Sequence, residues 1–175
     1  MALSRDQIVA AAWGILQSYG LGDLSMRRLA KELGVQPGAL YWHVANKQEL
    51  LGVLAQRMVA PLSELTFDDA APPLERAAHL TGEFRSLILA VRDGADVVSV
   101  AHSISPEELN PAPELATLVT GSGVSRETAM ATALTLIRFT LGSVTTQQTR
   151  EAMGLDTSSS EAEFTAGVEL VLHSR

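Results

Sequence analysis

The stretch LSMRRLAKELGVQPGALYWHVANKQELL, residues 24–51, decides the fold because it predicts two short helices joined by a tight turn. Ser25 is placed to cap the first helix, and Gly34 suits the left-handed backbone that commonly ends one. Pro37 then stands where the first turn of the next helix needs no backbone N–H. Two short helices separated by a turn with glycine are typical of a helix-turn-helix, and a generic helical bundle with short connections fits the same pattern.

Helices are also predicted on both sides of this stretch. Ser4, followed three residues later by a glutamine, forms a capping box for a helix whose apolar stripe extends to Tyr19. Asn46 and Glu49 form a second capping box, which opens a helix that runs to about residue 61. The first third of the chain is therefore expected to hold four helices.

The rest of the chain also has a helical pattern. The segment TFDDAAPP, residues 66–73, is polar and contains two prolines, so it separates this part from the first. Beyond it, apolar residues recur at helical spacing, and no strand pattern is convincing. Helices are predicted near residues 73–92, 95–102, 111–120, 125–150 and 161–173. We therefore expect an all-α protein.

Composition limits the class of protein. The 175 residues include no cysteine, which excludes disulfides and thiolate chemistry, and 46% of them are apolar, which is ample for a packed core. No apolar run approaches the roughly 18 residues that suggest a membrane span, and the charged amino-terminal segment does not fit a signal peptide. The protein is therefore expected in the cytoplasm. It carries no phosphate-binding loop, Gly-x-Ser-x-Gly or His-Glu-x-x-His motif, so no catalytic site, metal site or cofactor is expected.

Charge is unevenly distributed along the chain. Residues 1–58 hold six basic and four acidic groups, a net charge of +2, although the whole chain has a net charge of −7. The remainder holds seven basic and sixteen acidic groups, a net charge of −9. This asymmetry favours an anionic partner for the amino-terminal part.

Three adjacent side chains, Tyr41, Trp42 and His43, need an explanation because successive helical residues point about 100° apart. They cannot all be buried on one face. In a helix that enters the major groove of DNA, Tyr41 and His43 would reach phosphates, and Lys47 would add a charge-assisted bond. In the alternative interpretation, Tyr41 and Trp42 cover a small core while His43 is solvated.

The stretch 24–51 resembles the DNA-binding module of the TetR family of transcriptional repressors, and this resemblance covers roughly residues 5–55. The segments FRSLILAVRDGADV, FTLGSV and FTAGVELVL are similar to the tetracycline-repressor branch of that family. The resemblance implies an all-α homodimer that binds a palindromic double-stranded DNA operator and releases it when a small-molecule inducer binds. It also implies an N-terminal three-helix helix-turn-helix domain (residues 1–46) and a larger helical ligand-binding and dimerisation domain (residues 47–175), with the helix over 46–61 as connector.

The resemblance also implies which residues meet DNA. Arg27 would contact a base or a phosphate from the second helix, and Gln36 and Arg27 are the best candidates for direct base readout. The operator should differ from that of the tetracycline repressor, because the residues that open the third helix differ. The predicted DNA-binding residues are Arg27, Gln36, Pro37, Gly38, Ala39, Tyr41, Trp42, His43 and Lys47.

The ligand side departs from the family pattern. Val98 replaces the histidine that binds the drug's magnesium in the tetracycline repressor, and other polar family positions are replaced by Leu80, Ser63, Ala101 and Thr146. A valine cannot ligate Mg²⁺, so we expect a small, largely apolar inducer that is not magnesium–tetracycline. The predicted ligand-binding residues are Leu80, Phe84, Val98, Ala101, His102, Thr135, Arg138 and Phe139. The apolar members of this set could equally belong to an ordinary core. His102 could be a hydrogen-bonded core histidine, and Arg138 could pair with a carboxylate of the partner subunit.

The homodimer is expected to form through the helices near 125–150 and 161–173, where Gly142 and Gly167 would allow close helix approach. Several other functions share some of these features. A transcriptional activator or an inducer-free repressor would share every DNA-facing residue. A small-molecule-binding module or an enzyme without a role on DNA is the remote alternative.

Overall fold

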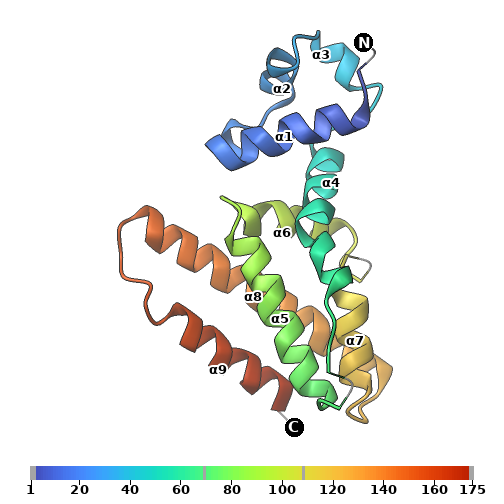
Figure 1. Ribbon diagram of the computed structural model, residues 1–175, viewed down its shortest axis with the longest axis vertical. Helices are drawn as coiled ribbons and strands as arrows, with labels where there is room; N and C mark the ends of the chain where they lie inside the picture. Colours follow the sequence, from blue (N-terminus) through green and yellow to red (C-terminus); the bar gives the residue numbers. More distant parts are fainter. Residues whose placement is uncertain (1–2, 69, 108, 174–175) are drawn as a thin grey trace.

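The computed structural model describes residues 3–68, 70–107 and 109–173, and every regular element in these ranges is helical (Figure 1). This confirms the all-α prediction. The elements are α1 (Arg5–Tyr19), a 3-10 turn (Leu21–Asp23), α2 (Met26–Glu32), α3 (Pro37–Leu40), α4 (Lys47–Val59), a second 3-10 turn (Ala60–Glu64), α5 (Pro73–Leu89), α6 (Gly94–Ile104), α7 (Ala112–Thr120), α8 (Arg126–Ala152) and α9 (Ser160–His173).

The helices form a head and a body. Helices α1–α3 make the head at one end of the molecule, and α5–α9 make the body at the other, with α4 leading from one to the other (Figure 1). The chain begins at the head and α9 ends at the far side of the body. The surfaces of the head are thus set apart from those of the body.

Local sequence explains the start of α1 and its end at Gly20, which adopts φ +83°, but not the exposure of Tyr19. The Ser4 hydroxyl accepts from the Gln7 N–H at 3.2 Å and the Gln7 side chain accepts from the Ser4 N–H at 3.0 Å, so the predicted capping box is present. Tyr19 was expected to complete the apolar stripe, and this was wrong because its side chain is 53% exposed. The Arg28 guanidinium lies 4.0 Å from the centre of the Tyr19 ring, so a cation–π contact takes the place of burial.

The helix-turn-helix is built as its caps predict, with one difference. The Ser25 hydroxyl accepts from the Arg28 N–H at 3.2 Å, and Gly34 adopts φ +65° after α2. Helix α3 is a single turn, and residues 41–43 continue as turns rather than as helix. Leu40 and Val44, on either side of that turn, are fully buried and hold it against the head core.

Only one of the two hydrogen bonds of the capping box predicted for α4 is present. Asn46 accepts from the Glu49 N–H at 2.8 Å, but the Glu49 carboxylate accepts from the Ala45 N–H at 2.7 Å instead of from Asn46. The other Glu49 oxygen lies 2.8 Å from the Arg5 guanidinium, which draws the carboxylate toward α1. One side chain therefore ties α1 to the beginning of α4.

In the body, α8 is the longest helix and packs against α5, α6, α7 and α9. Its buried positions face a core to which α5 contributes Leu80, Phe84 and Ile88, all with no exposed surface. Helix α5 ends at Leu89, earlier than predicted, and the chain turns sharply before α6 because Asp93 adopts a left-handed conformation with φ +54°.

Candidate functional site

Residues 36–43 form one surface of the head, which we call the α3 surface. With Leu40 buried beneath it, the side chains of Gln36 and Pro37 and the Gly38 backbone are exposed, and Ala39 is half-buried. A Cβ added at Gly38 would meet nothing within 4 Å, so packing inside the protein does not require a glycine there. The absence of a side chain at Gly38 therefore matters only for a molecule that approaches the α3 surface from outside the protein.

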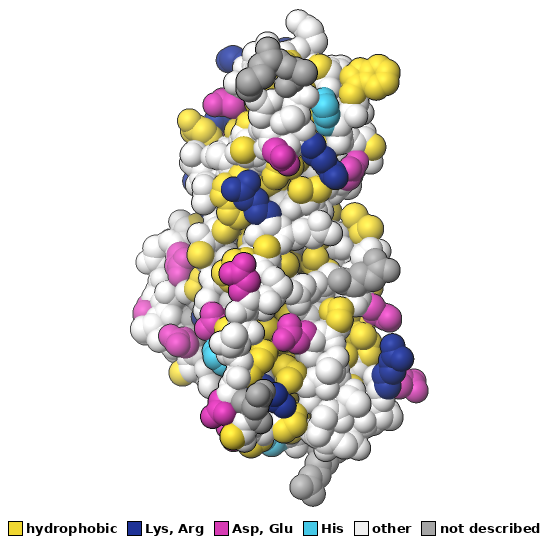
Figure 2. Space-filling view, turned by 45° about the vertical axis from the view of Figure 1, so that its right-hand side comes forward, with side chains coloured by type: hydrophobic (Ala, Val, Ile, Leu, Met, Phe, Trp, Pro, Cys, Tyr) yellow, Lys and Arg dark blue, Asp and Glu magenta, His cyan; other side chains and the backbone are white. Residues whose placement is uncertain are grey.

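The three adjacent aromatic side chains lie on the outer part of this surface. Trp42 is 90% exposed and Tyr41 is 52% exposed, while His43 is half-buried. The alternative interpretation that Tyr41 and Trp42 cover the head core is therefore wrong, because Leu40 and Val44 already close it. Hydrophobic side chains protrude from the head in Figure 2. Large exposed apolar groups of this kind commonly mark an interaction surface.

A groove of about 890 Å³ lies between α2 and the beginning of α3. Arg27, Gln36 and Pro37, which are separated in the sequence, all line it. Lys31 also lines it and was missed by the sequence reasoning, although it follows Arg27 by four residues and so lies on the same face of α2. The groove therefore has two exposed cations from α2 facing the start of α3.

The other basic groups of the head fall into two kinds. Arg28 pairs with Asp23 and covers the Tyr19 ring, so its charge serves the fold. Lys47 lies half-buried in the first turn of α4, where free backbone N–H groups and the helix dipole favour an anion. Lys47 therefore sits where both its own charge and the helix terminus attract a phosphate.

The predicted ligand-binding residues divide among several places. Leu80, Phe84 and Val98 have no exposed surface and belong to the body core. Thr135 is exposed on α8, and its hydroxyl donates to the Ala131 carbonyl at 2.8 Å. Each of these four positions is compatible with a purely structural role, so their assignment to a ligand stays a prediction.

Arg138 and Phe139 line a second groove of about 530 Å³ between α8 and α9. The Phe139 ring stacks on Phe164 of α9, with 5.5 Å between the ring centres and 6° between their planes. A Cβ added at Gly167 would collide with the Phe139 ring, so this glycine permits close approach of α8 and α9 within one chain. Gly142, in contrast, is exposed, and a Cβ there would meet nothing within 4 Å.

His102 is the most unusual of the predicted residues. Its side chain is buried, and neither ring nitrogen has a hydrogen-bond partner among the described residues. Burial lowers the pKa of His102, and the nearby Arg138 charge lowers that pKa further. The ring is therefore neutral at pH 7, and the interpretation of His102 as a hydrogen-bonded core histidine is not supported within the described part of the chain.

Arg85 of α5 is also buried, and no local pattern in the sequence indicates this. Its guanidinium donates to the side-chain oxygen of Gln147 and lies 5.0 Å from the centre of the Phe164 ring. These two contacts compensate only part of the cost of burying a cation. Arg85 was missed because its burial depends on the joint packing of α5, α8 and α9.

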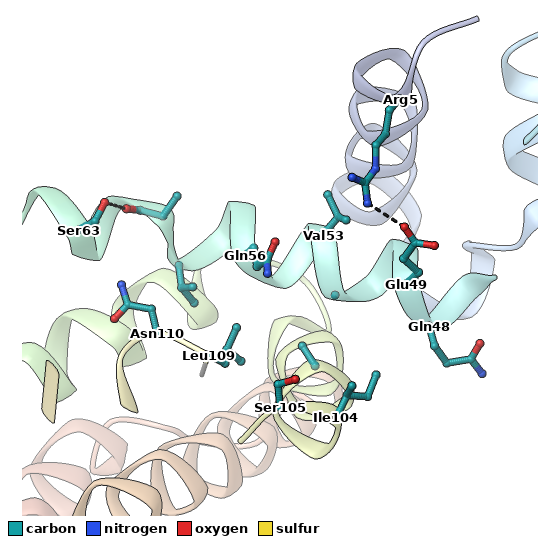
Figure 3. A pocket seen from close by; sticks show the side chains of 14 residues that line it. Arg5, Gln48, Glu49, Val53, Gln56, Ser63, Ile104, Ser105, Leu109 and Asn110 are labelled. Carbon is teal, nitrogen blue, oxygen red and sulfur yellow. Dashed lines mark hydrogen bonds and ion pairs between the residues drawn. The ribbon is translucent and has the colours of Figure 1, made fainter. Parts of the chain in front are cut away.

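A third groove, of about 540 Å³, lies between α4 and the end of α6, and we call it the α4–α6 groove (Figure 3). Of the predicted ligand residues, Ala101 lines it. Its lining residues are Arg5, Gln48, Glu49, Gly52, Val53, Gln56, Val59, Ala60, Ser63, Ala101, Ile104, Ser105, Leu109 and Asn110. The size falls within the range of sites that bind small molecules.

Part of α9 leaves apolar side chains uncovered. Leu170 is 73% exposed, and Ala166, one turn earlier on the same face, is also exposed. Across residues 3–68, 70–107 and 109–173, no group of three His, Cys, Asp or Glu side chains is placed to hold a metal ion. No helix in that same part of the chain is long and apolar enough to cross a membrane.

Two family models match the chain. Residues 8–54 match the model described as bacterial regulatory proteins, tetR family, and residues 73–173 match the tetracyclin repressor-like C-terminal domain. The class C tetracycline repressor protein of Escherichia coli is 33% identical over 153 residues, which cover 86% of this chain and 68% of that one.

Solved structures are also similar to this chain over nearly its whole length. The crystal structure of BioQ with its natural double-stranded DNA operator is 32% identical, with a TM-score of 0.82, and the match covers 98% of this chain and 99% of that one. A TetR variant from Acinetobacter baumannii AYE in complex with minocycline is 27% identical, with a TM-score of 0.83 and coverage of 97% and 94%.

Proposed function

This chain belongs to the tetR family of bacterial regulatory proteins, and we propose that it is a homodimeric transcriptional repressor that a small molecule releases from a palindromic DNA operator. The observation that carries this proposal is the α3 surface, where exposed aromatic side chains lie beside an unobstructed helix start. A head with net positive charge on an otherwise acidic chain supports it. Relatives are transcriptional regulators rather than enzymes.

We assign the DNA contacts as follows. Gln36 and Arg27 read base edges from the groove between α2 and α3, and Pro37, Gly38 and Ala39 let that end of α3 approach the bases. The phosphate backbone is held by Tyr41, Trp42, His43 and Lys47. Lys31 joins this set because it shares the groove with Arg27.

The chain divides into a DNA-binding domain over residues 1–46 and a ligand-binding and dimerisation domain over residues 47–175, with α4 as connector. The uncovered apolar face of α9 and the neighbouring α8 form the dimer interface, since an obligate homodimer buries a symmetric apolar surface. A regulator that acts on DNA is expected in the cytoplasm.

The inducer is not magnesium–tetracycline. Val98, at the position of the family's magnesium-binding histidine, is fully buried, and its side chain has no atom that can bind a cation. Thr146 stands where the family has a glutamate, which removes a second hard ligand. A calorimetric titration that found tight, magnesium-dependent binding of tetracycline would overturn this assignment.

The test of the proposed function begins with selection of genomic fragments that the purified protein retains. Operator binding is then measured by fluorescence anisotropy for the wild type, for Arg27→Ala and for Arg57→Ala. Arg57 is the matched control because it lies on α4, outside the α2–α3 groove, with its guanidinium 5.2 Å from the centre of the Trp13 ring. We expect Arg27→Ala to weaken operator binding by about 1–3 kcal/mol and Arg57→Ala to leave it within about threefold. Equal losses in both variants would contradict the assignment.

A further inference from the structure

Arg85 of α5 is a buried cation without a counter-charge in the described part of the chain. It is 7% exposed, its guanidinium donates to the side-chain oxygen of Gln147, and it lies 5.0 Å from the centre of the Phe164 ring. Its Nε atom has no hydrogen-bond partner, and no carboxylate in residues 3–68, 70–107 and 109–173 forms an ion pair with it. Buried cations are ordinarily paired, because the hydration that they lose must be replaced. An anionic group beside Arg85 would therefore be stabilised.

The same arginine lines a groove of about 250 Å³ between α5 and α9, which pack against each other in the body (Figure 1). The lining residues lie within 78–86 of α5 and 161–169 of α9, and we call this the α5–α9 groove. Gly82 lies one turn before Arg85 on the same face of α5, and a Cβ added to it would meet nothing within 4 Å. The groove shares no lining residue with the α4–α6 groove or with the groove between α2 and α3. It is smaller than the roughly 300–1,000 Å³ of sites for drug-sized ligands, so it suits a smaller molecule.

The solvent side of the groove is acidic. Glu83 lines it from α5, Glu161 and Glu169 line it from α9, and all three side chains are exposed. A carboxylate oxygen of Glu83 lies 3.7 Å from the Nε2 atom of the histidine one turn earlier, and one of Glu169 lies 3.2 Å from the Nδ1 atom of the histidine one turn later. The carboxylates repel a simple anion, and the buried guanidinium repels a simple cation. The groove therefore favours a small molecule that carries both charges.

The floor of the groove is apolar. Phe164 and Val168 lie one turn apart on the same face of α9 and are only 5% and 3% exposed. The Phe164 ring is held from the side of α8 by Phe139, with 5.5 Å between the ring centres. An apolar group that lies on this floor is removed from water, which favours binding.

We propose that the α5–α9 groove is a binding site for a free α-amino acid with an apolar side chain. The carboxylate of the amino acid accepts from the Arg85 guanidinium, its ammonium group faces the three glutamates, and its side chain lies on Phe164 and Val168. An α-amino acid fits because both of its charged groups are attached to one carbon atom, which leaves the side chain free to reach the floor. The inference goes beyond the proposed function, since this site is separate from the α3 surface and requires neither DNA nor an inducer.

The ligand class is tested by isothermal titration calorimetry of the full-length protein with L-leucine. Two analogues serve as controls: 3-methylbutylamine, which is leucine without its carboxylate, and 4-methylpentanoate, which is leucine without its ammonium group. We expect L-leucine to bind with a Kd below about 1 mM and each analogue at least about tenfold more weakly, because each lacks one charge-assisted contact. Absence of leucine binding at about 10 mM, or equal binding of either analogue, would overturn the proposal.

The location is tested with two variants of the groove. Arg85→Met removes the charge at similar side-chain length, and Gly82→Leu fills the groove while leaving the contacts of Arg85 in place. We expect each to weaken leucine binding at least about tenfold. Gly14→Leu is the matched control, since Gly14 is also helical with nothing within 4 Å of a Cβ and lies outside the groove. Circular dichroism shows whether each variant folds, and wild-type leucine affinity in folded Gly82→Leu would overturn the proposal even if Arg85→Met does not fold.

The acidic side of the groove has its own matched pair. Glu161 and Glu127 are both exposed acidic residues in the first turn of a helix, α9 and α8 respectively, and Glu127 lies outside the groove. We expect Glu161→Gln to weaken leucine binding at least about threefold and Glu127→Gln to leave it unchanged. Equal affinities in the two variants would count against the proposed position of the ammonium group. None of these titrations contains DNA, so their failure would leave the proposed function standing, and a failure of operator binding would leave this inference standing.

Discussion

The contact between the head and the body at Asp93 leads to a quantitative prediction. One Asp93 carboxylate oxygen accepts from the Leu21 N–H at 2.7 Å, joining residues 72 positions apart. Asp93 itself has φ +54°, a left-handed conformation that asparagine and glycine tolerate better than alanine. Gly20 lies beneath this contact with φ +83°, and a Cβ there would collide with the carboxylate. Asp93 therefore combines a hydrogen bond and an unfavourable backbone conformation at one site.

Three substitutions separate these two contributions. Asp93→Ala removes a charge-assisted hydrogen bond, which is worth about 1.5–3 kcal/mol, and leaves the Leu21 N–H partly buried without it. It also places alanine in the left-handed region, which adds about 1 kcal/mol. The free energy of unfolding should therefore fall by about 3 kcal/mol in all. Asp93→Gly should cost about 2 kcal/mol because the backbone is unstrained, and Asp93→Asn about 1 kcal/mol because an amide oxygen still accepts.

The assay is urea unfolding followed by far-ultraviolet circular dichroism, with all proteins at one chain concentration because the dimer couples stability to concentration. Asp96→Ala is the control, since Asp96 is an exposed acidic residue in the first turn of α6, the helix that Asp93 precedes. The free energy of unfolding of this control should stay within about 0.5 kcal/mol of the wild-type value. The reasoning about the backbone is refuted if Asp93→Gly is as destabilising as Asp93→Ala. The reasoning about the hydrogen bond is refuted if Asp93→Ala unfolds like the wild type.

Three further predictions concern the core, the pH response and the DNA contact. Gly167→Ala should lower the free energy of unfolding by about 1–3 kcal/mol, because the new methyl group collides with Phe139, whereas Gly14→Ala should not destabilise the protein; equal urea midpoints would contradict this. Burial holds the pKa of His102 below that of an unfolded histidine, so below about pH 6.5 the unfolded chain takes up a proton that the folded protein does not. Stability should therefore fall between pH 7 and pH 5, and His102→Leu should flatten that part of the curve; an unchanged slope would count against the assignment. Lys47→Ala should weaken binding to operator and scrambled DNA alike and reduce the slope of log K against log salt by about 1, and a loss confined to the operator would show base readout instead.

The helices could be predicted because their signals are local. Ser4 and Ser25 cap their helices with side chains that reach only three residues along the chain, and Gly34 ends its segment through its own backbone preference. The head and its exposed aromatic surface were therefore within reach of the sequence.

The ligand-binding site could not be predicted from the sequence, because it depends on how helices that are distant in the chain pack against one another. Periodicity shows that Leu80 and Phe84 turn inward, but not whether a cavity remains between them and α8. The burial of Arg85 requires contacts across α5, α8 and α9, and the stacking of Phe139 on Phe164 requires α8 and α9 to pack together. The α4–α6 groove likewise joins residues from Arg5 to Asn110, and no local pattern relates them.

The most direct measurement of the central claim is an equilibrium titration of the wild-type protein with a selected palindromic operator and with a scrambled duplex of equal length. It is made at about 150 mM salt and repeated across a salt series, since phosphate contacts depend on salt. The account predicts two chains per operator and an affinity at least about a thousandfold above that for the scrambled duplex. Equal affinity for the two duplexes, or no binding to either, would contradict it.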